Sequence, residues 1–246
     1  MDISHTEDGY VMISYDGGAD RVQVQITNPD GSRNPYPLEK GDYRALPLTG
    51  GNGTYLIEVL AHVSGGMYST ALSKQVSVQL ADEFSPFLYP NQYCLYDRDS
   101  KVVAQARKLS KRSSDDEEFI TRVFKYVTKN IEYDNEFAKA IPVNYLPNPD
   151  ETMKKKKGIC LDYASLMTAM LRSQGMPTKL EVGYAGEEYH AWISVYVEGK
   201  GWIDHVIELS GDTWTLVDPT LAAGNDRHEA AEYMEEDENY TVKYNY

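Results

Sequence analysis

The chain has 246 residues, of which 41% are hydrophobic and 25% are charged. This length suits one large domain or two smaller ones, and the composition excludes collagen-like, low-complexity and wholly disordered proteins. The 24 basic and 38 acidic residues give a net charge of −14 at pH 7, so neither nucleic acid nor an anionic membrane is an expected partner. No apolar run approaches the roughly 18 residues of a transmembrane helix, so we expect no membrane insertion.

Residues 9–80 carry the pattern of β-strands. The segment 21–27 alternates strictly, with Val22, Val24 and Ile26 on one face. Two longer strand candidates, 54–63 and 67–80, flank a Ser-Gly-Gly sequence that is typical of a hairpin turn. We therefore predict a small all-β sandwich over residues 1–85, followed by a second domain over residues 86–246.

Helical periodicity begins near residue 100 and predicts two helices. Asp99 or Ser100 is the expected cap of the first. Ser114 and Glu117 have the spacing of a capping box, which predicts the start of the second. Residues 134–157 contain three prolines and end in four consecutive lysines. We expect this segment to be a long loop, with the lysines in solvent.

A third helix is predicted over residues 160–174, because its apolar residues repeat at helical spacing and Gly175 and Pro177 follow as a typical helix end. Strands are expected after it, at 180–184, 191–197, 202–207 and 213–217, with a last one near 240–244. Helices followed by antiparallel strands make this second domain α+β.

Cys160 opens the predicted helix. A thiol at a helix N-terminus faces the positive end of the helix dipole, so we expect its pKa to fall below about 8.5. The backbone N–H groups there can also hold a developing oxyanion. From this residue alone, a buried structural thiol and a disulfide with Cys94 stay open. The chain has only these two cysteines, too few for a metal site made of cysteine alone.

His190 begins a strand candidate in which alternation places it with Trp192 and Ser194, on the face opposite the apolar residues. An imidazole within reach of the thiol takes its proton during attack and later protonates the leaving group. Asp218, which follows the apolar segment 213–217, is the candidate that orients the imidazole. Asp204 competes for this role.

Four segments resemble motifs of the transglutaminase-like superfamily. The resemblance rests on Gly158-Ile159-Cys160-Leu161-Asp162-Tyr163-Ala164, on His190-Ala191-Trp192, on Val217-Asp218-Pro219-Thr220, and on Ile131-Glu132-Tyr133-Asp134 upstream. It covers about residues 115–225. It implies a papain-like α+β core, in which the nucleophile helix packs on an antiparallel sheet, and a catalytic triad of Cys160, His190 and Asp218. It also argues against a disulfide between Cys94 and Cys160.

This resemblance implies acyl transfer on amide bonds through a thioester on Cys160. With water as acceptor the protein is a cysteine peptidase or amidase acting on a protein or peptide, which is our first expectation. With an amine as acceptor it is a transglutaminase. The alternative from another class is a non-catalytic binding module of the cell envelope with an occluded triad, and a third is a structural surface protein.

The resemblance requires no metal or cofactor. One oxyanion donor is expected to be the backbone N–H of Cys160. Gln92 and Tyr145 are candidates for a second, side-chain donor, and the sequence favours neither. Residues 1–85 distantly resemble β modules that precede such domains in bacterial surface proteins. No basic-then-apolar leader begins the sequence, so we expect a secreted or cell-surface bacterial protein whose leader has been removed.

Overall fold

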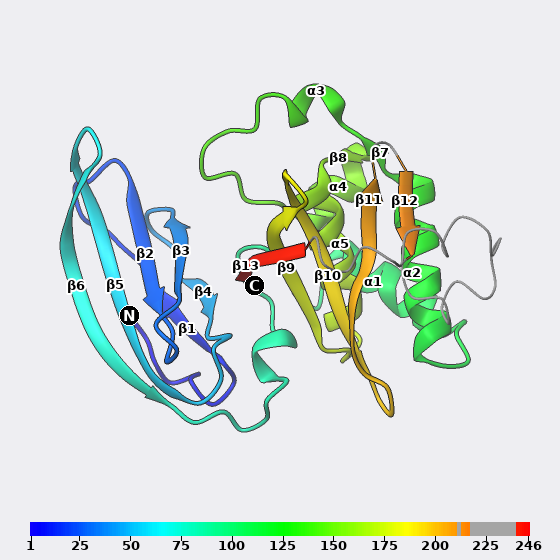
Figure 1. The fold of residues 1–246 in the computed structure, drawn as a ribbon, viewed down its shortest axis with the longest axis horizontal. Helices are drawn as coiled ribbons and strands as arrows, with labels where there is room; N and C mark the ends of the chain where they lie inside the picture. The colour runs from blue at the N-terminus through cyan, green and yellow to red at the C-terminus, as the bar shows by residue number, and fades with distance from the viewer. Residues whose placement is uncertain (211–212, 217–239) are drawn as a thin grey trace. The chain divides into compact units, whose positions relative to one another are not determined.

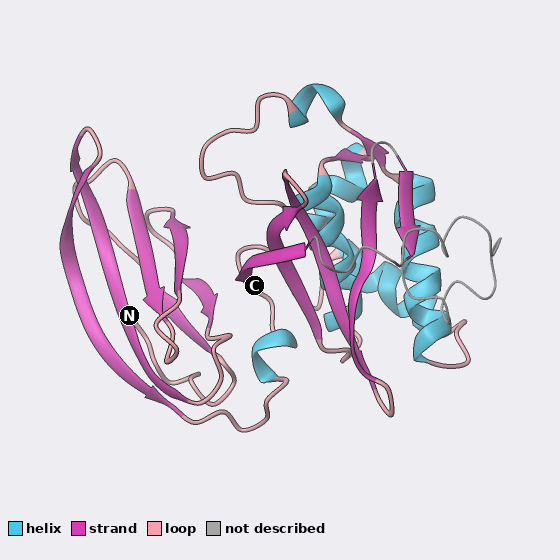
Figure 2. Ribbon diagram, in the orientation of Figure 1, coloured by secondary structure: helices cyan, strands magenta, loops and turns pink. Residues whose placement is uncertain are grey.

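The computed structural model describes residues 1–210, 213–216 and 240–246. The chain divides into two compact units, Met1–Gln92 and Tyr93–Tyr246. In the first unit, strands are followed by one short 3-10 helix, η1 (Ser85–Phe87), while the second combines helices with an antiparallel sheet (Figure 2). The predicted class, an α+β domain preceded by β-strands, is confirmed.

The first unit contains two antiparallel sheets. Its strands are β1 (Tyr10–Ile13), β2 (Val22–Thr27), β3 (Arg33–Leu38), β4 (Arg44–Pro47), β5 (Gly53–Ser64) and β6 (Met67–Val78). One sheet has the order β3-β2-β5-β6, and in the other β1 pairs with β4 (Figure 1). The predicted hairpin between β5 and β6 is present, and Gly65 adopts a φ of 56° in its turn, a conformation that glycine accepts without strain.

Side chains join these two sheets around a common core. Val22, Val24 and Ile26 are buried, as the alternation predicts. The Tyr36 hydroxyl of β3 donates to the Pro47 carbonyl of β4 at 3.4 Å. Strand β3, which contains two prolines, was not predicted from the sequence. Because β3 lies at an edge of its sheet, the missing N–H groups of proline are tolerated there.

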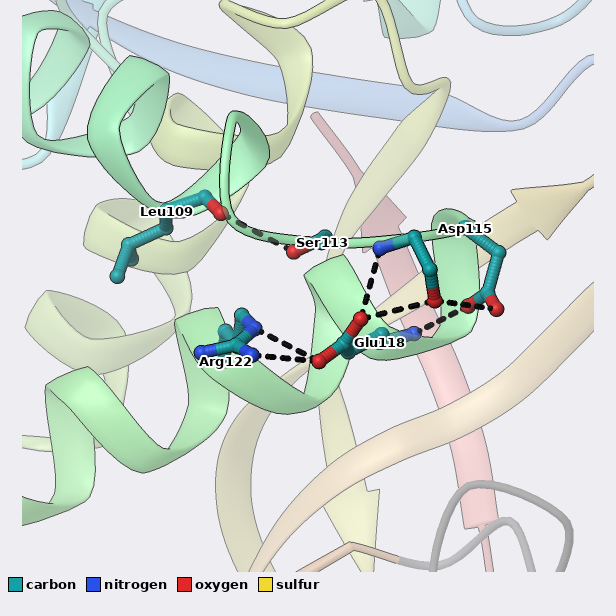
Figure 3. A network of polar contacts seen from close by, with 6 residues as sticks. Leu109, Ser113, Asp115, Glu118 and Arg122 are labelled. Atoms are coloured by element: carbon teal, nitrogen blue, oxygen red, sulfur yellow. Dashed lines mark hydrogen bonds and ion pairs between the residues drawn. The ribbon is translucent and has the colours of Figure 1, made fainter.

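The second unit begins with α1 (Lys101–Ser110) and α2 (Asp116–Asn130). Asp115 caps α2 by accepting the Glu118 N–H at 2.8 Å, so the predicted box of Ser114 and Glu117 is wrong by one residue. The Glu118 carboxylate accepts from the backbone N–H and the hydroxyl of Ser114. It also accepts from Arg122 (Figure 3). These hydrogen bonds, led by the Ser114 backbone N–H, lower the pKa of Glu118 to about 2.

Residues 134–157 are not the single long loop that was predicted. They contain α3 (Asn135–Ala138) and α4 (Pro149–Lys155), and the strand β8 (Lys157–Gly158) begins at their end, in parallel pairing with β7 (Glu132–Tyr133). Asn148 caps α4 by accepting the Glu151 N–H at 3.1 Å, and proline stands at the first helical position, where its missing N–H has no consequence. The nucleophile helix therefore follows ordered backbone.

The helix predicted at 160–174 is α5 (Cys160–Arg172), and Gly175 behind it has a φ of 85°. The strands of the second sheet are β9 (Thr178–Ala185), β10 (Glu188–Val197), β11 (Gly201–Ser210), β12 (Thr213–Leu216) and β13 (Tyr240–Asn245). Their order is β12-β11-β10-β9-β13, with every pair antiparallel. Helix α5 packs against β9 and β10 (Figure 1). Within the described residues, no helix is long and apolar enough to cross a membrane.

Candidate active site

Cys160 is the first residue of α5 and is partly exposed. Both it and Cys94 are free thiols, as the resemblance implied. Burial raises the pKa of Cys160 above its ordinary value, and hydrogen bonding from the backbone amides of Ala191 and Leu161 opposes this rise. The expected lowering of the pKa is therefore wrong, because the cost of desolvating a thiolate exceeds the benefit of the helix terminus.

Asp162 holds the first turn of α5 in place. Its carboxylate accepts the Ile159 N–H at 2.9 Å and the Tyr145 hydroxyl at 2.6 Å. The carboxyl is buried, and desolvation raises its pKa. Gly158 makes this arrangement possible, because a Cβ atom at that position would lie 2.6 Å from the Asp162 Cβ. The motif around Cys160 thus contains the two residues, Gly158 and Asp162, that fix the first turn of α5.

His190 lies on β10 and is 8% exposed. The amide of Ala191, the next residue, acts on the Cys160 sulfur, so the structure brings the thiol and the His190 segment together. No hydrogen bond between the sulfur and the imidazole appears among the described residues. Burial lowers the pKa of His190, and the nearby Glu188 opposes this. Both shifts favour the neutral forms, a thiol beside an imidazole.

The imidazole Nε2 of His190 is buried and has no hydrogen-bond partner within the described part of the chain. Asp204 is exposed on β11 and, among these same residues, makes no hydrogen bond to His190. Asp218 lies outside the described residues. Its role as the group that orients the imidazole stays a prediction.

The face of β10 that carries His190 is buried, as is the apolar face on the other side of the strand. Trp192 and Ser194 are 1% and 0% exposed. Both donate to the Glu181 carboxylate of β9, Trp192 from Nε1 at 2.9 Å. Trp192 also meets Tyr240 of β13 edge-on, with ring centroids 5.3 Å apart. Both faces of this central strand are thus covered.

Sequence reasoning did not single out Tyr189, although it directly precedes His190. Its side chain is 57% exposed, and its ring lies edge-on to Tyr184 of β9 at 5.4 Å. Burial raises the pKa of Tyr189, followed by the effects of Tyr244 and Tyr184 and, last, of Cys160. The Tyr189 hydroxyl therefore lies within electrostatic range of the Cys160 sulfur. The available sequence signal was a large aromatic residue directly before the candidate base.

The two candidates for the second oxyanion donor differ in their hydrogen bonding. Tyr145 donates its hydroxyl to Asp162, and burial raises its pKa. Gln92, the last residue of the first unit, is buried, and neither its amide nitrogen nor its oxygen has a partner among the described groups.

Residues 1–210, 213–216 and 240–246 contain no cluster of three or more His, Cys, Asp or Glu side chains that could hold a metal ion.

A thiol at the start of a helix, with its sulfur against the backbone of a strand that carries a histidine, is compatible with a thiol-dependent acyl-transfer site. Comparison with known families agrees: residues 103–205 match the model described as the transglutaminase-like superfamily. The matched residues include helix α5 and strands β9 and β10, which pack together as the predicted α+β core requires.

Two relatives are similar to part of the chain. The chain is 33% identical to UPF0252 protein MJ1282 of Methanocaldococcus jannaschii, over 40% of this chain and 31% of the relative. It is 28% identical to Uncharacterized protein YebA of Bacillus subtilis, over 34% of this chain and 13% of the relative. The chain therefore spans about a third or less of both relatives.

A solved structure named "Putative Cysteine Protease from Cytophaga hutchinsonii" is also similar. The TM-score is 0.44 at 18% identity, with 79% of this chain and 77% of the other covered.

Proposed function

We propose that this protein is a cysteine peptidase or amidase that cleaves amide bonds in protein or peptide substrates. One observation carries the proposal: Cys160 begins α5 with its sulfur against the backbone of Ala191, next to the buried imidazole of His190. The match of residues 103–205 to the transglutaminase-like superfamily supports it, because that resemblance implies acyl transfer through a thioester on a cysteine.

The reaction begins with the neutral pair. As the Cys160 sulfur attacks the amide carbonyl carbon, His190 takes the thiol proton and becomes an imidazolium. The backbone N–H of Cys160 donates to the oxyanion of the tetrahedral intermediate. The carbon–nitrogen bond then breaks, the imidazolium protonates the departing amine, and a thioester remains on Cys160. Asp218 is proposed to accept the N–H of His190 and to stabilise its charged form.

Water completes the cycle. His190 takes a proton from the attacking water, the oxygen bonds to the thioester carbon, and the carbon–sulfur bond breaks. The sulfur leaves with the proton from His190, and a carboxylic acid is released. A primary amine in place of water gives a new amide, which is transglutamination when the acyl group comes from glutamine. The steps up to the thioester are common to both reactions.

The test is incubation with denatured casein, with and without a fluorescent primary amine. We expect new peptides from the wild-type protein, and none from Cys160→Ala. Fluorescent casein in place of peptides would assign the transglutaminase reaction.

The occluded binding module is favoured by the raised pKa of Cys160. If wild-type protein gives neither peptides nor labelled casein, the enzymatic proposal is overturned and the binding module takes its place.

A further inference from the structure

Four consecutive lysines, at positions 154–157, lie directly before the nucleophile helix. We refer to them as the lysine cluster. All four are exposed. The chain has only 24 basic residues against 38 acidic ones, so this run holds a sixth of its lysine and arginine in four positions. The proposed chemistry above does not use the cluster.

Backbone hydrogen bonds hold the lysine cluster at a defined place. Helix α4 ends within it, and Lys156 adopts the left-handed conformation, with a φ of 55°. The Lys156 carbonyl accepts the Glu132 N–H at 2.9 Å, and the Gly158 carbonyl accepts the Asp134 N–H at 2.9 Å. Since Lys156 is four residues before Cys160, an extended chain places their Cα atoms at most about 14 Å apart.

The cluster carries more positive charge than its neighbours balance. Lys154 pairs with Glu151 at 3.2 Å, and Lys157 approaches Glu132 at 3.9 Å. Lys155 and Lys156 form no ion pair within the described residues. Two exposed ammonium groups are therefore available to a ligand.

Further carboxylates lie on the neighbouring elements, namely Asp134 after β7, Asp150 on α4 and Asp162 on α5. Lys155 acts electrostatically on Asp162, but that carboxylate is buried and already accepts from Ile159 and Tyr145. The positive end of the α5 dipole, at Cys160, adds a field of the same sign as the lysines. A negatively charged group approaching the thiol therefore meets a local attraction on a protein that is acidic as a whole.

We propose that the lysine cluster binds acidic side chains of the substrate, so that the enzyme prefers peptides with aspartate or glutamate near the amide bond that Cys160 attacks. This inference rests on the proposed function and adds the substrate class. Lys155 and Lys156 contact the substrate carboxylates, while the pairs with Glu151 and Glu132 keep the flanking lysines in position.

The test compares two reagents that alkylate Cys160 and differ in charge, anionic iodoacetate and neutral iodoacetamide. The variant is Lys155→Glu/Lys156→Glu. The matched control is Lys108→Glu/Lys111→Glu, which reverses two exposed lysines at the end of α1. Asp150 of α4 binds the opposite end of that helix, at the Lys101 and Val102 N–H groups, so the control charges lie about 10 to 15 Å further along α1.

We expect the iodoacetate-to-iodoacetamide rate ratio to fall at least about threefold in the cluster variant at low ionic strength. It should stay at the wild-type value in the control, and the difference should shrink at about 0.5 M salt. The neutral variant Lys155→Gln/Lys156→Gln should give a rate ratio between those of the wild-type protein and the cluster variant.

A second experiment uses a peptide in place of a charged reagent. Oligoglutamate should protect wild-type Cys160 from iodoacetamide more strongly than oligoglutamine, and this difference should disappear in the cluster variant.

The two proposals fail in different ways. Alkylation of Cys160 by iodoacetamide that depends on His190, with the same reagent ratio and the same protection in all variants, would overturn the lysine cluster as a substrate site and leave the proposed function standing. A Cys160 that reacts with neither reagent would overturn the proposed function, and the inference with it.

Discussion

The two ends of helix α5 each lie beside a cysteine, and they treat it in opposite ways. At the first residue, the Cys160 thiol is partly exposed beside an imidazole whose Nε2 has no partner among the described groups. At the last residue, Arg172 lies against the fully buried thiol of Cys94. The same residue type therefore occupies a site open to chemistry at one end and a closed one at the other.

The closed end is held by the guanidinium of Arg172, which is 2% exposed. Its Nε donates to the Thr178 carbonyl at 2.8 Å, one terminal nitrogen donates to the Tyr246 carbonyl at 2.6 Å, and the other lies 3.2 Å from the Cys94 sulfur. Through these bonds, Arg172 of α5 is joined to the segment before α1, to β9 and to the residue that follows β13. The hydrogen bonds of the Arg172 guanidinium indicate a structural role. The buried His190 imidazole, whose Nε2 has no partner among the described groups, is instead a candidate for proton transfer.

The largest expected effect separates the two cysteines. Cys160→Ala removes the nucleophile and should lower amide cleavage at least about a thousandfold. Cys94→Ala should keep activity within about threefold and lower the free energy of unfolding by about 1–2 kcal/mol, because Arg172 loses an acceptor. Casein cleavage and urea unfolding measure both. Equal loss of activity in the two variants would remove the distinction between the ends of α5.

His190→Gln should lower cleavage by a factor of about 10² to 10⁴, because the thiol loses its proton acceptor. The free energy of unfolding should change much less than activity. His62→Gln, on β5 in the first unit, is the control and should retain wild-type activity. A His190→Gln variant with normal cleavage would place the base elsewhere.

Arg172→Met should destabilise the protein by about 3 kcal/mol, since two buried carbonyl oxygens lose their donor. The control is Arg122→Met on α2. Arg122 pairs with Glu118 one helical turn away and its side chain is 38% exposed (Figure 3), so its loss should cost about 0.5 kcal/mol or less. Urea denaturation gives both values. If both variants lose a similar amount of unfolding free energy, the hydrogen bonds of Arg172 stabilise the protein no more than an exposed ion pair does.

Tyr145→Phe gives the smallest effect and tests the support of the open end. Asp162 loses one of its two named donors, and stability should fall by about 1–2 kcal/mol. Tyr43→Phe, at a side chain that is 53% exposed, should change stability by less than about 0.5 kcal/mol. If Tyr145→Phe is as silent as Tyr43→Phe, Asp162 does not depend on that hydroxyl.

Much of the fold could be predicted because its long elements have strong periodicity. Helix α5 shows an apolar repeat that ends at Gly175, and β2 alternates without a break. Helix α4, with seven residues, is too short for a periodic signal. The start of α2 was misplaced by one residue because Ser114 and Asp115 are both good capping residues and acidic residues follow at both spacings.

The sequence predicts which residues form the candidate site better than it predicts the direction of their pKa shifts. The sequence shows that Cys160 opens a helix, but it does not show how deeply the sulfur is buried, and burial decides the direction of its pKa shift. Glu181 and Tyr189 were missed because their contacts depend on the register between β9 and β10, which pairs Glu181 with Trp192 and Tyr184 with Tyr189. Register is set by the folded sheet and not by one strand alone.

The most direct test of the central claim is the rate of iodoacetamide alkylation of Cys160 between about pH 5 and pH 9, with Cys94 in the same protein as the internal control. Burial lowers the pKa of His190, so the imidazole should stay neutral at pH values below its ordinary pKa of about 6.5. The alkylation rate of Cys160 should therefore remain high to a lower pH. The rate should then fall as the imidazole becomes protonated.

In His190→Gln, alkylation of Cys160 should be slow at neutral pH and rise only as the thiol ionises, above about pH 8.5, since burial raises the pKa of this thiol. Cys94 should react slowly in both proteins. The account predicts a fast, His190-dependent reaction at Cys160 alone. Equal rates at the two cysteines, or a Cys160 profile that His190→Gln leaves unchanged, would contradict it.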